Sequence, residues 1–182
     1  VLEPGQNAGN QGKSPAPLMN VATIKKYDIA NGVGVRVSLF VSGCRHRCPG
    51  CFNEVAWDFG YGTPYTEKTE RELLDALRPG YIRGLTLLGG EPFEPENQAV
   101  LLSLLDRVRR ELPGKDVWCY SGFTFEELTG EGARCVTPLT RRLLEKIDVL
   151  VDGRFVADLA DISLVFRGSS NQRVLDAGAS LA

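Results

Sequence analysis

The sequence predicts an α/β protein whose mostly parallel sheet forms an open or partial (β/α) barrel. Short apolar segments typical of strands alternate with longer segments that have the periodicity of amphipathic helices. This alternation produces βαβ units, and their right-handed crossovers place the carboxyl ends of the parallel strands at one edge of the sheet. About 160 residues are available for these elements, too few for a complete eightfold barrel of about 250 residues. We therefore expect an incomplete barrel.

The first predicted strand covers residues 33–41 and follows a turn signal at Asn31-Gly32. Aliphatic side chains occupy every second position along it, namely Val33, Val35, Val37, Leu39 and Val41. This alternation indicates a strand with at least one buried face. The strand leads directly into Ser42-Gly43 and a cysteine-rich segment.

The remaining elements alternate in order along the chain. Short apolar strands are predicted at residues 85–88, 117–120 and 149–151. Helices are predicted at residues 66–77, 96–112, 124–128 and 139–147. Thr66 or Thr69 is the expected N-cap of the first helix. The segments that end the three strands are Gly89-Gly90-Glu91-Pro92, Ser121-Gly122 and Asp152-Gly153. In α/β folds the ligand site lies at this edge, so we expect these segments to meet the cysteine-rich segment there.

Composition bounds the organisation and the class of protein. Residues 1–18 are rich in Gly, Pro, Asn and Gln, so we expect a disordered tail or a cloning remnant. Residues 19–182 contain no repeat or long linker, and we expect them to form one domain. The apolar fraction of 43% and charged fraction of 24% suit an ordinary globular protein. The net charge of −2 gives no reason to expect nucleic acid as a partner, and no apolar run suits a membrane span.

The cysteines are the strongest chemical signal in the sequence. Three of the five, Cys44, Cys48 and Cys51, fall within a stretch of eight residues. A secreted disulfide scaffold distributes its cysteines differently, so we expect a reducing cytoplasm. Three thiols on one short loop with Gly and Pro can surround a metal centre, and thiolates favour zinc or iron–sulfur clusters.

Three interpretations of this loop remain open from the residues alone. In the first, three cysteines hold a [4Fe–4S] cluster and leave one iron open for a substrate. In the second, a structural zinc site uses His46 as its fourth ligand, although His46 follows Cys44 more closely than is usual for paired zinc ligands. In the third, Cys48 and Cys51 form a C-x-x-C redox pair, which leaves Cys44 without a role.

The spacing C-x3-C-x2-C is the signature of the radical S-adenosylmethionine (SAM) superfamily. The surrounding sequence resembles one family within it, the activating proteins of anaerobic ribonucleoside-triphosphate reductase. The resemblance covers about residues 27–174, and the matching stretches are NGVGVRVSLFVSGCRHRCPGCFNEVAWDF, LGGEPFEPEN, PGKDVWCYSGF, DVLVDGRFVADL and FRGSSNQRV. The cysteine spacing alone indicates only the superfamily, whereas VDGRF and RGSSNQ point to the reductase activases.

The resemblance implies a radical SAM fold in which Cys44, Cys48 and Cys51 ligate three irons of one [4Fe–4S] cluster. SAM would chelate the fourth iron, and an electron from the reduced cluster would cleave it to methionine and a 5′-deoxyadenosyl radical. That radical would take a hydrogen atom from a glycine of the large reductase subunit and leave a glycyl radical there. The family also suggests a flavodoxin-like electron donor.

The resemblance also implies a set of SAM contacts. They are Gly50, Cys51, Phe52, Gly89, Gly90, Glu91, Ser121 and Asp152. Glycines let the backbone approach the methionine amino group closely, and a carbonyl or the Glu91 carboxylate can accept from an ammonium. Family members often carry an aromatic residue just before the last cysteine. Here that position is Gly50, and Phe52 follows the cysteine instead.

Simpler interpretations stand beside these. The chain could activate another glycyl radical enzyme, such as pyruvate formate-lyase, or be a non-catalytic zinc-binding module. His46 is expected to be a solvent-facing loop residue, and Cys119 and Cys135 to be structural thiols. Residues 168–171 are expected to form a surface turn or to help dock the reductase.

Overall fold

A computed structural model describes residues 19–181, and the prediction for residues 1–18 lies outside them. The elements are, in chain order, β1 (Asn20–Asp28), β2 (Val35–Val41), η1 (Glu54–Trp57), β3 (Thr63–Pro64), α1 (Glu67–Leu77), β4 (Ile82–Gly89), α2 (Pro95–Glu111), β5 (Asp116–Tyr120), α3 (Phe125–Thr129), α4 (Thr140–Leu144), β6 (Val149–Asp152), η2 (Ala157–Leu159), β7 (Arg173–Asp176) and α5 (Ala177–Leu181).

The strands form one seven-stranded sheet in the order β3-β1-β2-β4-β5-β6-β7. The four central strands, β2, β4, β5 and β6, are parallel. Strands β1 and β7 flank them antiparallel, and β3 adds to β1. Over residues 19–181 the strand order begins at β3 and ends at β7 without closing. The predicted α/β class and open, mostly parallel sheet are therefore confirmed.

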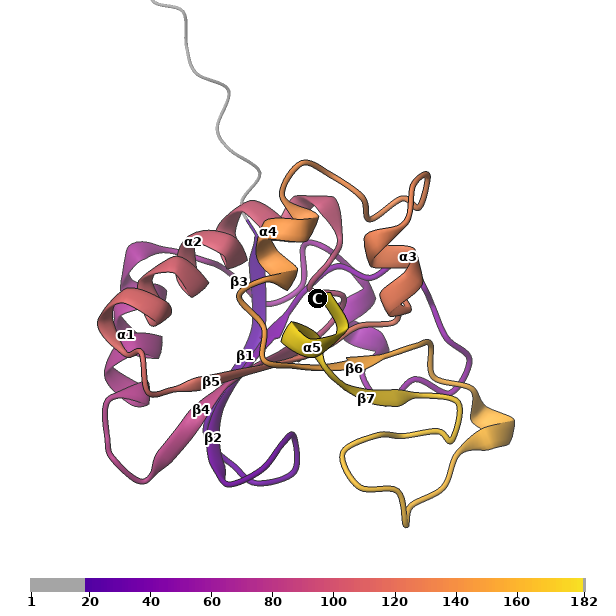
Figure 1. Ribbon diagram of the computed structural model, residues 1–182, viewed down its shortest axis with the longest axis horizontal. Helices are drawn as coiled ribbons and strands as arrows, with labels where there is room; N and C mark the ends of the chain where they lie inside the picture. The colour runs from indigo at the N-terminus through magenta and orange to yellow at the C-terminus, as the bar shows by residue number, and fades with distance from the viewer. Residues whose placement is uncertain (1–18, 182) are drawn as a thin grey trace, which may run out of the picture.

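Helices α1, α2 and α4 cover one face of the sheet (Figure 1). Alternate residues of the central strands point into this layer and are fully buried there: Val37, Leu39, Leu85, Leu87, Val117 and Cys119. They pack with helix residues that include Leu73, Leu77, Leu101, Leu104 and Leu143. The alternation seen in the first predicted strand therefore marks the face that builds the hydrophobic core.

The opposite face of the sheet carries polar and aromatic residues and is covered by loops. The Arg36 side chain is fully buried there, where its Nε donates to Thr86 Oγ1 at 2.7 Å. The Thr86 hydroxyl in turn donates to the carbonyl of Asn31 in the loop after β1, at 2.8 Å. From the segment after β6, the Phe166 ring meets Trp118 edge-on, with the ring centroids 5.2 Å apart. Both loops lie below the sheet in Figure 1.

The main predicted elements are present with small shifts at their ends. Thr66 is the N-cap of α1 and forms a reciprocal capping box with Thr69, so each side chain satisfies a free backbone donor. Helix α4 ends at Leu144, three residues earlier than predicted. The antiparallel strands β1, β3 and β7 were not predicted. Of the helices in residues 19–181, none has both the length and the apolar character needed to cross a bilayer.

Candidate functional site

The cysteine loop begins at the carboxyl end of β2. The Cys44 amide donates to the carbonyl of Trp57 at 3.2 Å, and the Cys51 amide donates to the carbonyl of Cys48 at 3.1 Å. Arg47 and Gly50 have positive φ angles of 49° and 74°, which turn the chain between the cysteines. All five cysteines are free thiols. The loop is therefore a compact, backbone-bonded turn that carries three thiols.

The glycine-rich segment after β4 is bonded directly to the start of this loop. The Gly90 amide donates to the Val41 carbonyl at 2.7 Å, and the Glu91 amide donates to the Gly43 carbonyl at 2.8 Å. A Cβ on Gly90 would stand 2.5 Å from the Gly43 oxygen, closer than real contacts allow. Gly89 has a φ of +112°, which favours glycine. Because Gly89 and Gly90 have no side chains, the segment after β4 and the start of the cysteine loop come into direct backbone contact.

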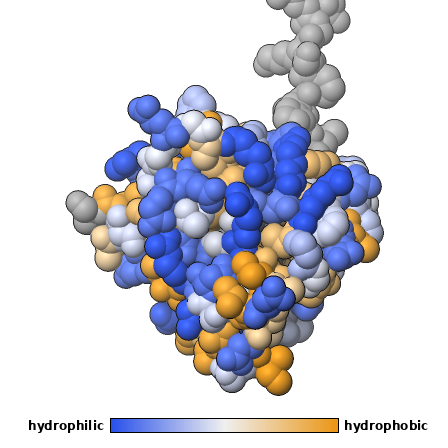
Figure 2. Space-filling view, turned by 90° about the vertical axis from the view of Figure 1, so that its right-hand side faces the viewer, coloured by the Kyte–Doolittle hydropathy of each residue, from blue (hydrophilic) through white to orange (hydrophobic). Residues whose placement is uncertain are grey.

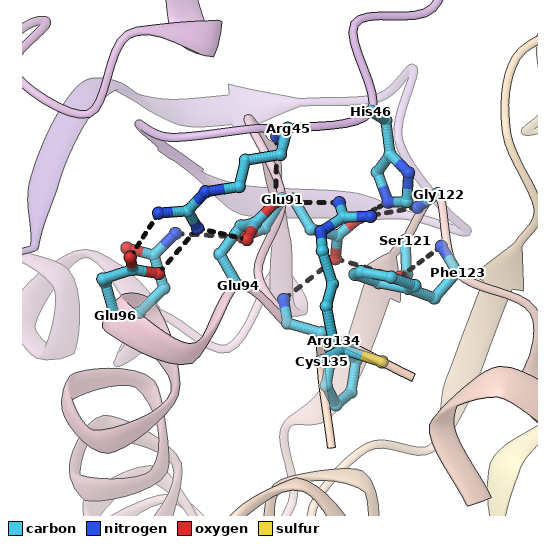
Figure 3. A network of polar contacts seen from close by, with 12 residues as sticks. Arg45, His46, Glu91, Glu94, Glu96, Ser121, Gly122, Phe123, Arg134 and Cys135 are labelled. Carbon is cyan, nitrogen blue, oxygen red and sulfur yellow. Dashed lines mark hydrogen bonds and ion pairs between the residues drawn. The ribbon is translucent and has the colours of Figure 1, made fainter. Parts of the chain in front are cut away.

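The Glu91 carboxylate, only 1% exposed, ties together three loops of the site (Figure 3). Its Oε1 accepts from the Phe93 amide and from the Ser121 hydroxyl, both at 2.9 Å. Its Oε2 accepts from the Gly122 amide at 2.7 Å and lies 3.1 Å from His46 Nε2. A buried carboxylate needs such partners, because each donor offsets part of its desolvation. Glu91 therefore serves the protein's own hydrogen bonds.

The His46 side chain is buried, and the expectation that it faces solvent is wrong. Its side chain is 2% exposed, and its ring meets Phe123 edge-on at a centroid distance of 4.3 Å. Arg154 Nε donates to His46 Nδ1 at 3.0 Å. Because arginine can only donate, the ring proton sits on Nε2 and is directed to Glu91. Sequence reasoning missed this role because the partners of His46 come from segments about 45, 77 and 108 residues further along.

A second anchor of the cysteine loop is the neighbouring residue Arg45. The Glu94 side chain, which is fully buried, accepts from the Arg45 amide at 2.8 Å and from its guanidinium at 2.7 Å. Arg134 Nη2 donates to the same carboxylate at 3.0 Å. Figure 3 shows Arg45 and Arg134 approaching Glu94 from different segments. Two consecutive loop residues, Arg45 and His46, thus hold the cysteine loop to the segment that joins β4 to α2.

One cavity of about 340 Å³ opens on the loop-covered side of the sheet. Its volume lies at the lower end of the range for small-molecule sites. Among its lining residues are Cys44, His46, Cys48, Cys51, Phe52, Gly89, Gly90, Glu91, Tyr120, Ser121, Gly122 and Gly153. The four segments that the topology was predicted to bring together therefore do meet. They lie at the carboxyl edge of the parallel strands.

Two predicted site residues lie outside the cavity lining. Gly50 faces Phe155 and Ala157, each 3.6 Å from where its Cβ would be. The buried Asp152 carboxylate accepts from the Phe125 amide at 2.7 Å and from Arg173 Nε at 3.0 Å. Asp152 therefore fixes the end of β6 to α3 and β7. The predicted contacts of Gly50 and Asp152 with SAM stay predictions.

A family model described as a 4Fe-4S single cluster domain matches residues 30–175 of the chain. Several curated relatives share the name "anaerobic ribonucleoside-triphosphate reductase-activating protein". The one from Pasteurella multocida is 47% identical over 156 residues, which is 85% of this chain and 95% of the relative. The one from Escherichia coli K12 is 43% identical over 158 residues, or 86% and 97% of the two chains. The chain belongs to this family.

The family also includes a protein from enterobacteria phage T4, 38% identical over 156 residues, or 86% of this chain and 93% of the relative. Membership confirms the resemblance drawn from the cysteine motif and the VDGRF and RGSSNQ segments. The last two segments have a local structural role in this member of the family. Asn171 Nδ2 donates to the Arg154 carbonyl at 2.8 Å, and Gln172 Nε2 donates to the Gly153 carbonyl at 2.9 Å.

The donor set fits an iron–sulfur cluster. Soft thiolates are its usual protein ligands, and Cys44, Cys48 and Cys51 line the same cavity. Over residues 19–181, no three His, Cys, Asp or Glu side chains converge on a single metal ion. Cysteine ligands of a cluster bind separate irons, so they need not converge in that way. Both ring nitrogens of His46 have protein partners, so it is not available as a fourth zinc ligand.

Two of the three thiols, those of Cys44 and Cys48, have a raised pKa. Burial, together with the nearby Glu91 charge, raises the pKa of Cys44 to about 12. Burial also raises the pKa of Cys48 above its usual value. A metal ligand must be a thiolate, so loading the cluster releases protons that these thiols otherwise keep.

Proposed function

We propose that this chain uses a [4Fe–4S] cluster, held by Cys44, Cys48 and Cys51, to cleave SAM and to generate a glycyl radical on anaerobic ribonucleoside-triphosphate reductase. Family membership supports the activity. The observation that carries the site is that the three thiols and the Gly89-Gly90 turn line one cavity. This arrangement is what a cluster with an open iron and a chelating ligand beside it requires.

When bound and reduced, the cluster would supply the one electron needed to cleave SAM to methionine and a 5′-deoxyadenosyl radical, which would take a hydrogen atom from a glycine of the reductase. The chain's own residues bind and orient the reactants. Gly89 and Gly90 present bare backbone to the cavity, so the backbone can approach the methionine amino group. Because the Glu91 carboxylate already has four donors, we assign the ammonium to backbone carbonyls of this turn and a positioning role to Glu91.

Part of the cavity wall is apolar. Leu88, Phe155, Leu164 and Phe166 supply apolar lining to the cavity. A radical that meets solvent or stray side chains would be quenched, so an apolar lining favours the reaction. We further propose the radical SAM type of fold for the open sheet, a flavodoxin-like protein as electron donor and the cytoplasm as location. Phe52, Ser121 and the loop glycines remain proposed SAM contacts.

The deciding experiment mixes the oxygen-free, iron- and sulfide-reconstituted protein with dithionite, SAM and the reductase. We expect a glycyl radical signal in electron paramagnetic resonance. The Cys48→Ala variant should fail to assemble the cluster and give no signal, because it removes a ligand while the core is built elsewhere. The matched control is Cys119→Ala, which removes a thiol from the helix-covered face of β5.

Three results would contradict the proposal. One is a Cys48→Ala protein that still cleaves SAM under dithionite, which would show that the ligand assignment is wrong. Another is a radical that forms on pyruvate formate-lyase and not on the ribonucleotide reductase, which would move the activity to the other glycyl radical enzyme. Stoichiometric zinc in a colourless protein would defeat the iron–sulfur assignment altogether.

A further inference from the structure

Tyr120 carries a buried hydroxyl without a protein partner. It is the last residue of β5, and its OH hydrogen bonds to no atom of residues 19–181. A buried hydroxyl that lacks a partner costs free energy, and native proteins rarely leave one unsatisfied. The position is therefore one where a bound molecule can supply the missing hydrogen bond.

The register of the sheet places Tyr120 beside the glycine-rich turn. Cys119 pairs with Leu87 across β5 and β4, so Tyr120 comes level with the last residues of β4. Since strand side chains alternate, Tyr120 shares the loop-covered face with Trp118, while Cys119 points into the core. Tyr120, Leu88 and Gly89 all line the cavity that holds the three thiols.

The surroundings of Tyr120 keep it neutral and able to donate. Burial raises its pKa above the usual value for tyrosine, so the hydroxyl is protonated throughout the neutral range. The aromatic rings of Phe155 and Phe166 line the same cavity. The charged side chains of Arg36 and Asp28 also act on the Tyr120 hydroxyl. The cavity thus offers apolar rings together with a tyrosine hydroxyl that can both donate and accept.

We infer that the Tyr120 hydroxyl hydrogen bonds the nucleoside half of SAM. The inference rests on the proposed function, which places the methionyl half at the cluster and the Gly89-Gly90 turn. A molecule anchored at that turn would place its ribose and adenine in the same cavity, which Leu88 and Tyr120 also line. The ribose hydroxyls and ring nitrogens of adenosine are the hydrogen-bonding groups that SAM offers there. The aromatic lining suits the flat adenine ring. Tyr120 is then a residue that selects for the nucleoside.

Calorimetric titration of the reconstituted protein with SAM tests this directly. The Tyr120→Phe variant keeps the ring and removes one hydroxyl, so we expect the Kd for SAM to rise about 3- to 10-fold with the cluster content unchanged. The Kd for 5′-deoxyadenosine should rise by a similar factor, and that for methionine should not change. The Tm of the variant without SAM should equal or exceed that of the wild type, because an unpaired buried hydroxyl has been removed. The matched control is Tyr61→Phe, whose side chain is 42% exposed.

Three outcomes would overturn the inference. An unchanged Kd for SAM and 5′-deoxyadenosine would show that the hydroxyl serves water or the glycine-bearing peptide instead, while the proposed function stands. A lower Tm together with equally weakened methionine binding would show a structural role. A wild-type protein that carries its cluster but does not bind SAM would contradict the proposed function and this inference with it.

Discussion

At the scale of single residues, the site divides into groups that sequence reasoning can identify and groups that it cannot. The cysteines and the Gly89-Gly90 turn follow from spacing and from their position after strands. The engagement of His46 and Glu91 does not, because it depends on Ser121, Gly122 and Arg154 from distant segments. A sequence pattern predicts which strand end a residue occupies, but not which donors surround it there.

The Glu91 carboxylate provides a test at this scale. In Glu91→Gln the amide nitrogen replaces one acceptor oxygen and faces donors that it cannot satisfy. We expect the free energy of unfolding to fall by about 2–4 kcal/mol, measured by urea denaturation. The control is Glu54→Gln at an exposed position, which should change it by less than about 0.5 kcal/mol. Equal stability of the two variants would mean that the four hydrogen bonds contribute little.

At the scale of elements, the site depends on how strands end. The predicted strands are confirmed because their apolar residues alternate or lie buried on both faces. The antiparallel strand β1 was missed because most of its residues are partly or fully exposed and carry no clear alternation. The same holds for β7, whose four residues have no buried position. Such flanking strands form because a neighbouring strand offers hydrogen bonds, and that neighbour is invisible in a local pattern.

The turn after β4 makes a prediction about close packing. In Gly90→Ala the new Cβ would stand 2.5 Å from the Gly43 oxygen and 2.9 Å from the Ala56 oxygen, both of them backbone atoms. We expect a loss of about 1–3 kcal/mol in the free energy of unfolding. The iron content after reconstitution should fall too, because Gly43 precedes Cys44. Gly114→Ala has no atom within 4 Å of the added carbon and should leave both quantities unchanged. Full iron content in Gly90→Ala would refute this coupling.

The junction of α3, β6 and β7 makes a prediction about pH. Hydrogen bonds from Arg173 lower the pKa of Glu126 from 4.5 to about 2. A carboxyl whose pKa is lower in the folded state stabilises the fold above its unfolded pKa and loses that contribution as the pH falls through the folded pKa. Stability should therefore fall between about pH 4.5 and 2, and Glu126→Gln should flatten the curve in that window. Because Glu126 is largely exposed, the effect should be small and should shrink with added salt.

Urea titrations of the metal-free chain across this pH range, with Glu131→Gln as control, would measure the effect. A steep curve retained in Glu126→Gln would assign the acid sensitivity to other groups.

At the scale of the whole molecule, the two faces of the sheet have different tasks. The helix-covered face holds the hydrophobic core, and the loop-covered face holds the cavity. The segment between β6 and β7 bounds that cavity and exposes several large apolar residues: Val156, Leu159, Ile162 and Val165. Figure 2 shows apolar residues gathered low on the side of the molecule that lies at the right of Figure 1. Because the substrate glycine must reach the cavity, we expect the reductase to cover this segment.

Replacing an exposed residue there tests the docking surface. Ile162→Ser removes a fully exposed apolar side chain. We expect it to lower glycyl radical formation on the reductase by about tenfold, as loss of an interface anchor does. SAM cleavage in the absence of the reductase should stay at the wild-type rate. Tyr81→Ser, at the amino end of β4, is the control. Unchanged radical formation in Ile162→Ser would place the reductase elsewhere on the surface.

The chain contains a single histidine, His46, whose side chain is buried. A nuclear magnetic resonance spectrum of the protein will therefore show one imidazole. Its ring is flanked by Glu91 on one side and Arg154 on the other. Any event in the cavity, from metal loading to ligand exchange, should shift that one resonance. The imidazole of His46 is therefore a single built-in spectroscopic probe beside the cavity.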